Sequence, residues 1–296
     1  MSHPLEDLLS AAHEGDLERV KAALRSGTDI NGKDTSGEFS PTWGKAALHL
    51  AAERGDSGVA DVLLSAGADP NVLSAGSVII TAEAPLHIAA RRGDLEMCRM
   101  LIAGGSKPDL RQLDRHDAPG RFPLQLAIEN GRMDVVLLLL QTNEKVARLT
   151  ASAALYEATE AGHESVVRLL IEHGADVKKP FRKLGSTPLH VACFYGYAGI
   201  AKLYIDGGAD VHAVNRKGDT LMHIVADGAW LSPDHNHGGA EEPRDHAAVA
   251  QLLLKMGVSP SAANRRNETP LDLAQLHLPL NPRLAEIVRL LKQAAS

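Results

Sequence analysis

Aromatic residues are scarce in this sequence of 296 residues: Phe, Trp and Tyr together make up 3%, although hydrophobic residues make up 44%. The apolar core must therefore consist mainly of Ala, Leu, Val and Ile. Because small side chains let helices approach closely, this composition favours a stack of short helices over one thick core. At this length a single compact core would lie near its upper size limit.

The sequence also lacks a net positive charge, a long apolar run and a recognisable signal peptide. Its formal net charge is −6, which gives no general attraction to DNA, RNA or anionic lipid. The longest apolar run, 135–140, is far shorter than the roughly 18 residues that a membrane-spanning helix needs. The N-terminus has neither the basic nor the apolar region of a secretory signal. We therefore expect a cytoplasmic protein that binds neither nucleic acid nor membrane.

Cysteine is rare, and the two cysteines lie far apart within apolar stretches. Cys98 and Cys193 are therefore interpreted as small core residues of a protein in a reducing compartment. A nucleophilic role for Cys193 is disfavoured, because it occupies the position that Ala52 and Ala90 hold in similar segments.

An internal repeat organises the whole chain. Four segments read almost alike, and four weaker copies follow the same pattern: 47–52, 85–90, 188–193 and 221–226, then 7–12, 123–128, 154–158 and 270–274. Between successive anchor residues (Leu, or Met222) the spacings are 40, 38, 38, 31, 34, 33 and 49. These values fit a fixed unit of about 33 residues with connections of varying length.

Each unit carries the signals of two short helices. In six copies a glycine follows the anchor by seven residues, and a second apolar run then ends at another glycine. Glycine can adopt the left-handed conformation that ends a helix. The Thr-Pro pairs before several anchors favour a helix start, where Thr can cap free N–H groups. One such helix pair cannot bury its apolar face alone, so neighbouring units must stack on it.

The segment Thr187-Pro188-Leu189-His190-Val191-Ala192 matches the Thr-Pro-Leu-His-x-Ala signature of ankyrin repeats, and the chain resembles that family over nearly its full length. The resemblance implies an all-α ankyrin-repeat solenoid of helix-turn-helix units with short β-hairpin or loop fingers and a concave binding face. It also implies that the motif histidines bond backbone groups between repeats. We therefore assign a structural role to His49, His87, His190 and His223.

We expect a single ankyrin-repeat domain over residues 1–296. The predicted repeats are about 5–34, 45–72, 83–112, 121–149, 152–179, 186–215, 219–264 with an insert at 230–245, and 268–296. Polar residues at both ends are typical of capping units, so the array is expected to be complete. The segment 141–145 replaces the usual Gly-Ala-Asp, which makes a full finger after the fourth unit doubtful.

Aromatic residues gather on two adjacent repeats. Phe194, Tyr195 and Tyr197 surround the glycine that ends a first helix, where other units carry polar pairs, and Trp230 is placed at the position equivalent to Tyr197. The family exposes these positions near the concave face, and exposed aromatics in a groove often anchor a binding hot spot. The alternative is that the insert folds back and covers them.

Charged residues suggest a second set of partner contacts. Arg91 and Arg92 take the polar positions before a helix-ending glycine. Basic residues recur on the later fingers, where stacking would align them into a basic edge: Lys178, Lys179, Arg182, Lys183, Arg216, Lys217, Arg265 and Arg266. Complementary charge mainly steers association and sets specificity.

Catalysis has one weak candidate, the His-rich insert. Its possible zinc ligands are Asp234, His235, His237, Glu241, Glu242, Asp245 and His246. Their spacing matches no defined zinc signature, and the surrounding Gly and Pro residues indicate a solvated loop. No nucleophile elbow, phosphate-binding loop or dinucleotide fingerprint is present. We expect no cofactor and no enzymatic activity.

The sequence therefore predicts a scaffold or adaptor that binds a protein partner through its concave face and fingers, and that is monomeric on its own. An inhibitor or immunity-type protein that blocks one enzyme would use the same face. A metal-dependent enzyme using residues 230–246 is the remaining alternative.

Overall fold

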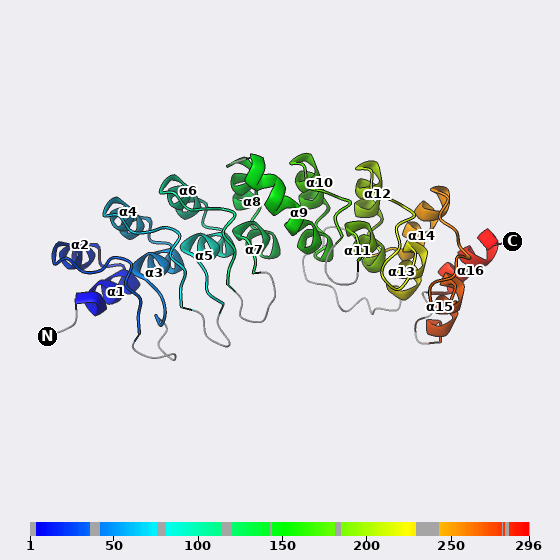
Figure 1. Ribbon diagram of the computed structural model, residues 1–296, viewed down its shortest axis with the longest axis horizontal. Helices are drawn as coiled ribbons and strands as arrows, with labels where there is room; N and C mark the ends of the chain where they lie inside the picture. The colour runs from blue at the N-terminus through cyan, green and yellow to red at the C-terminus, as the bar shows by residue number, and fades with distance from the viewer. Residues whose placement is uncertain are drawn as a thin grey trace. The chain divides into compact units, whose positions relative to one another are not determined.

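The computed structural model describes residues 4–35, 42–75, 81–113, 120–142, 144–180, 185–228, 243–279, 281 and 284–295. These residues form 16 helices and no β-strand (Figure 1). The predicted all-α solenoid of paired helices is therefore confirmed. The chain divides into two compact units, Met1–Thr150 and Ala151–Ser296.

In the first unit, short helices alternate between two rows. The first helix of each repeat packs against the first helix of the next, and the second helices do the same. The first-helix row consists of α1 (Pro4–Glu14), α3 (Ala47–Arg54), α5 (Pro85–Arg92) and α7 (Pro123–Glu129). The second-helix row consists of α2 (Leu17–Arg25), α4 (Ser57–Ser65), α6 (Leu95–Ala103) and α8 (Met133–Gln141).

The second unit repeats this arrangement (Figure 1). Its first-helix row contains α11 (Pro188–Tyr195), α13 (Leu221–Gly228) and α15 (Pro270–His277), and its second-helix row contains α10 (Glu164–Glu172), α12 (Ala198–Asp206), α14 (His246–Lys255) and α16 (Leu284–Ala295). Helix α9 (Glu144–Glu160) contains the division between the units, and it also runs through the repeat boundary predicted at 149–152.

The repeated anchor residues form the core, as the spacing predicted. Seven of the eight anchors are at most 1% exposed: Leu8, Leu48, Leu86, Leu124, Leu155, Leu189 and Met222. The eighth, Leu271, lies in the last repeat and is only half-buried. An anchor becomes fully buried when another repeat packs against it, so the exposure of Leu271 follows from its position in the final helix pair.

In the four repeats that carry the motif histidine, this residue caps the first helix. Nδ1 of His49, His87, His190 and His223 accepts a bond of 3.1–3.2 Å from the backbone N–H three residues earlier. The side chain of Thr187 makes no bond to a helix N–H group; its hydroxyl lies 2.8 Å from Nδ1 of His190. Thr269, which has Asp272 in place of the histidine, does accept from a helix N–H.

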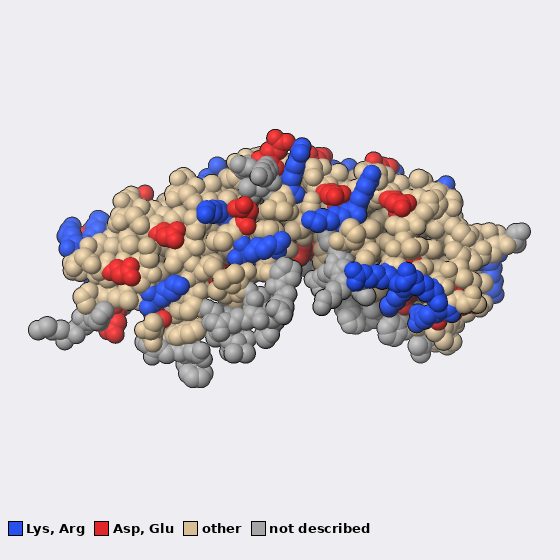
Figure 2. Space-filling model, viewed as in Figure 1, with Lys and Arg blue, Asp and Glu red and all other residues tan. Residues whose placement is uncertain are grey.

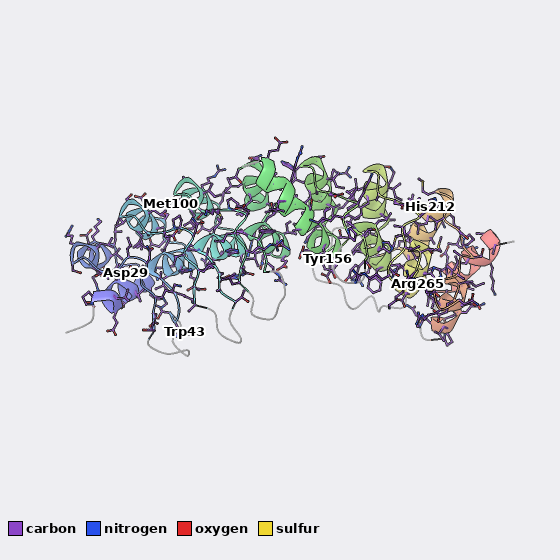
Figure 3. All side chains as sticks on the ribbon, in the orientation of Figure 1. Asp29, Trp43, Met100, Tyr156, His212 and Arg265 are labelled. Carbon is purple, nitrogen blue, oxygen red and sulfur yellow. The ribbon has the colours of Figure 1, made fainter. Side chains whose placement is uncertain are left out.

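The fingers contain much less β-structure than the family resemblance implies. Among the described residues, β-pairing is limited to three isolated bridges: Asp34–Trp43, Ala82–Leu113 and Val214–Thr220. Trp43 is labelled in Figure 3. After the fourth repeat the connection is shortest, because α8 ends at Gln141 and α9 already begins at Glu144. The doubt about a full finger at this point is confirmed.

Candidate partner-binding surfaces

The aromatic cluster of the second unit is only partly exposed. Phe194 and Tyr195, the last residues of α11, are half-buried, and their rings meet edge to face at 5.3 Å. The ring of Tyr195 stacks on that of Tyr197 at 5.8 Å. Its hydroxyl donates a bond of 2.9 Å to Glu160 on α9. Burial and this acceptor raise the pKa of the Tyr195 phenol.

The prediction that Tyr197 is exposed is wrong. The residue is 1% exposed and occupies the position before α12, where Asp16, Asp56 and Asp94 cap the equivalent helices. An aspartate at this position stays near water to cap the helix, whereas the tyrosine ring packs beneath Tyr195. The exposed part of the aromatic cluster is therefore Phe194 and Tyr195.

The described end of the insert is attached to α11. The backbone N–H of Asp245 donates to the carbonyl oxygen of Gly196 at 2.7 Å, and Nε2 of His246 bonds to that of Phe194 at 3.0 Å. The guanidinium of Arg244 lies 5.2 Å from the centre of the Tyr195 ring. Part of the insert thus packs on the aromatic cluster, as the alternative interpretation expected. Trp230 lies outside the described residues.

Two insert residues proposed as metal ligands have structural contacts. Asp245 caps α14 by accepting from the N–H of Ala248 at 2.9 Å, and burial lowers the pKa of His246. The other five candidates lie outside the described residues: Asp234, His235, His237, Glu241 and Glu242. Within the described part of the chain, no group of His, Cys, Asp and Glu has the arrangement of a metal site. The metal-site hypothesis stays a prediction.

Both cysteines are free and buried, as predicted for core residues. Burial raises the pKa of the Cys98 thiol to about 12 and also raises the pKa of Cys193. A thiolate is the reactive form of cysteine, so neither residue has the environment of a nucleophile.

In the first unit, three consecutive repeats carry an ion pair between residues eight positions apart. Lys45 pairs with Glu53 at 2.7 Å, and Arg121 pairs with Glu129 at 2.8 Å. Between them the order of charges is reversed, and Arg91 makes two bonds of 2.8 Å to the carboxylate oxygens of Glu83. The Arg91–Glu83 and Arg121–Glu129 pairs line an open pocket of about 380 Å³.

Arg91, a predicted contact residue, is therefore occupied within the repeat. The carboxylate of Glu83, which also accepts from Gln112 at 3.0 Å, raises the pKa of the Arg91 guanidinium. Arg92, the other predicted contact residue, is exposed. The three ion pairs were not predicted from the sequence, although opposite charges eight residues apart are visible in each of these repeats.

Basic residues on the turns of the second unit are exposed. Figure 2 shows Lys and Arg side chains gathered over this part of the unit, where Figure 3 labels Arg265. The exposed residues of the predicted basic edge are Lys178, Lys179, Arg216, Lys217, Arg265 and Arg266. Arg182 and Lys183 lie outside the described residues.

The motif histidines join repeats in three of four cases. Nε2 bonds to a carbonyl oxygen of the following repeat: His49 to Glu83 at 2.9 Å, His87 to Arg121 at 3.2 Å and His223 to Glu268 at 2.9 Å. Nε2 of His190 is buried and has no hydrogen-bond partner among the residues that the structure describes. Burial lowers the pKa of His49, His87 and His190 to about 4, which keeps these rings neutral near pH 7.

The paired helices, their histidine bridges and the left-handed glycines at helix ends define a helical repeat solenoid. The model of the family described as ankyrin repeats (3 copies) matches residues 48–153, 86–180 and 143–215. The chain therefore belongs to the ankyrin repeat family, whose repeats are typically protein-interaction modules.

The chain is also similar to one curated protein and to one solved structure. Over 163 residues the chain is 37% identical to Ankyrin repeat and SOCS box protein 16 of Mus musculus. The aligned region covers 46% of the chain and 36% of that protein. The chain thus matches about a third of the length of this relative. The crystal structure of the human ASB11 ankyrin repeat domain superposes with a TM-score of 0.56 at 24% identity, covering 84% of the chain and 96% of that domain. This second likeness concerns the fold alone.

None of the helices formed by the described residues has both the length and the apolar character needed to cross a bilayer.

Proposed function

We propose that this protein binds a partner protein through the exposed edge of its first helices and through its turns, and that it acts as a scaffold or adaptor. The observation that carries this proposal is the pair Phe194 and Tyr195. These two aromatic side chains stay partly exposed at the end of α11, in a chain that has few aromatic residues. Large amphipathic rings held rigidly at a surface are frequent binding anchors.

The surroundings of Tyr195 support a preformed contact surface. The bond to Glu160, the stack on Tyr197 and the nearby guanidinium of Arg244 hold the ring in one orientation. A side chain that is already fixed loses little conformational freedom on binding. Around this anchor we propose further contacts from the exposed charged residues predicted above: Arg92, Lys179, Arg216, Lys217, Arg265 and Arg266, with Arg182, Lys183 and Trp230 as additional candidates.

Arg91 and Tyr197 have weaker support as contacts. Arg91 already holds Glu83 in two hydrogen bonds, and Tyr197 is buried. We further propose that the protein is cytoplasmic, monomeric on its own, and works without catalysis or a bound cofactor.

An affinity-purification experiment tests this function. Cell extract is passed over immobilised wild-type protein, the double variant Phe194→Ser/Tyr195→Ser, and a control variant, Lys202→Ser, on the exposed face of α12. A partner that contacts the aromatic pair is retained by the wild type and the control and is lost from the double variant. Equal retention by all three proteins contradicts the proposed surface.

Binding the purified partner and assaying its activity in the complex distinguishes an adaptor from an inhibitor. An adaptor leaves its partner active in the complex, whereas an inhibitor of the immunity type abolishes the partner's enzymatic activity. Metal analysis of the purified protein tests the third alternative, because a zinc site in the insert would retain stoichiometric zinc.

A further inference from the structure

The turns that follow the sixth and seventh repeats share a sequence and a geometry. They read Asn215-Arg-Lys-Gly-Asp219 and Asn264-Arg-Arg-Asn-Glu268, so each places two cations directly after an asparagine. In both turns the asparagine Oδ1 accepts from two backbone N–H groups, at 2.8 and 3.0 Å in the first turn and at 2.9 and 3.1 Å in the second. These bonds fix the backbone of each dibasic tip.

A buried polar network locks the two turns together. The carboxylate of Asp219, which is 7% exposed, accepts from Nδ2 of Asn215 at 3.0 Å and from Nδ2 of Asn264 at 2.8 Å. The backbone N–H of Arg265 also donates to the carbonyl oxygen of Lys217 at 3.2 Å. A network whose donors and acceptors are satisfied specifies one arrangement of the groups that it joins.

Each leading arginine lies over the glycine of the turn before it. A methyl group added at Gly218 would lie 2.8 Å from Cγ of Arg265, and one added at Gly185 would lie 3.2 Å from Cγ of Arg216. Both glycines have positive φ angles, +79° and +69°. The stems of the arginines are therefore held between successive turns, while the residues remain exposed.

We propose that this cationic ladder, defined as Arg216, Lys217, Arg265 and Arg266, is a docking site for an acidic segment of the partner protein. The proposal rests on the protein-binding function proposed above and names the chemistry that one of its surfaces recognises. Four cations on two locked turns present a row of donors to carboxylates. Because the turns are fixed before binding, their alignment adds little ordering cost.

An acidic protein segment fits the ladder better than a nucleic acid or a lipid surface does. The protein carries a net charge of −6, which repels a long polyanion outside the ladder. No aromatic side chain lies in either turn to stack on a base. Among the described residues, the side chains of the four ladder cations form one ion pair within the protein, between Arg266 and Glu268 at 2.9 Å.

Binding of a fluorescent oligo-glutamate peptide to the full chain tests the proposal, with a neutral oligo-glutamine peptide as reference. In the ladder variant, Arg216, Lys217, Arg265 and Arg266 are each changed to Gln. The matched control changes four exposed cations of α10, α12, α14 and α16 to Gln: Arg168, Lys202, Lys255 and Arg289. Both variants shift the net charge equally, so any difference between them reports position.

The ladder variant is expected to bind the acidic peptide at least about tenfold more weakly than the control does, and added salt should weaken wild-type binding. A second variant, Lys217→Gln/Arg266→Gln, leaves both packed arginines in place and should lose several-fold in affinity while the unfolding midpoint stays unchanged. Equal binding by the ladder and control variants overturns the proposal.

Two further probes, single-stranded DNA of equal charge and vesicles containing phosphatidylserine, compare the other anionic classes. Tighter ladder-dependent binding of either probe than of the peptide also overturns the assignment to an acidic protein segment. Because the peptide is a defined probe, the peptide-binding measurement does not depend on the outcome of the affinity purification with the Phe194 and Tyr195 variants. If the wild-type protein captures its partner but does not bind the acidic peptide, the ladder proposal is contradicted and the proposed function is not.

Discussion

Nε2 of His49 lies 2.9 Å from the carbonyl oxygen of Glu83, 34 residues later in the chain. With Nδ1 accepting the N–H of Ala46, a neutral ring carries its proton on Nε2 and donates it to the next repeat. One side chain thus caps its own helix and fixes the start of the following repeat. His190 makes the first of these two bonds, and within the described part of the chain it does not make the second.

This difference predicts unequal effects of the same substitution. His49→Ala removes the cap, the packing and the bond to Glu83, whereas His190→Ala removes no bond between repeats. We expect His49→Ala to lower the free energy of unfolding by about 1 kcal/mol more than His190→Ala does. Urea unfolding followed by circular dichroism measures both values. A larger loss for His190→Ala would show that the bridge is not what stabilises the first unit.

Burial of the histidines predicts that stability depends on pH. The pKa of His49, His87 and His190 is lowered to about 4 by burial, and their main charged neighbours are Glu83 and Asp219. In the unfolded chain these rings bind a proton near pH 6.5. Between about pH 6.5 and 4 the unfolded state therefore holds more protons, so stability is full above this window and falls as the pH falls through it.

The expected loss is on the order of a few kcal/mol for each histidine once the pH reaches about 4. Urea midpoints between pH 7 and 5 measure the upper part of this fall, before most carboxylates titrate. His87→Gln removes one titrating ring, so the fall in stability with decreasing pH should become shallower. Gln can replace the histidine here because Gln125 occupies the same position in the next repeat and accepts the N–H of Phe122 at 2.9 Å. Identical slopes for the variant and the wild type would contradict the assignment.

The repeat and its core could be predicted because they depend on local rules. Apolar anchors at a fixed spacing identify residues that stacking buries, and a glycine such as Gly55 marks a helix end because it can reach φ +78°. The same reasoning failed at Tyr197, where position in the repeat suggested exposure. The family pattern describes the backbone position, whereas the fate of an unusual side chain depends on its neighbours.

The polar contacts between repeats could not be predicted from the sequence. The positions of Asn215 and Asn264 in equivalent turns were visible, but the carboxylate of Asp219 that joins them bonds across 45 residues. Likewise, the pairing of Tyr195 with Glu160 spans 35 residues. Spacing within one repeat predicts helices and turns, and only the packing of neighbouring repeats determines which polar groups meet.

Tyr197 and Tyr195 should respond differently to truncation. Tyr197 is 1% exposed, so Tyr197→Ala leaves a cavity and is expected to cost about 3–5 kcal/mol, as for other large buried aromatics. Tyr195→Phe keeps the ring and removes the bond to Glu160, which costs about 1 kcal/mol. Chemical denaturation of both variants measures these losses. A loss of less than about 1 kcal/mol for Tyr197→Ala would contradict its burial.

The attachment of the insert to α11 predicts a specific steric effect at Gly196. This glycine has φ +76°, and a methyl group added there would lie 2.6 Å from Nδ1 of His246. Gly257 is a matched control, because its φ is +80° and nothing lies within 4 Å of an added methyl group. Both changes to Ala place a side chain in the left-handed region, at a cost of about 1–2 kcal/mol.

Gly196→Ala should therefore be the more destabilising change, because it also displaces the His246 ring and breaks its bond of 3.0 Å to Phe194, for a further loss of about 1 kcal/mol. The double variant Gly196→Ala/His246→Ala isolates the cause. With the ring removed, the added methyl group has space, so Gly196→Ala in the His246→Ala background should cost no more than Gly257→Ala does. If the extra cost of Gly196→Ala persists in that background, the clash with His246 is not its origin, and the ring does not hold the insert against α11.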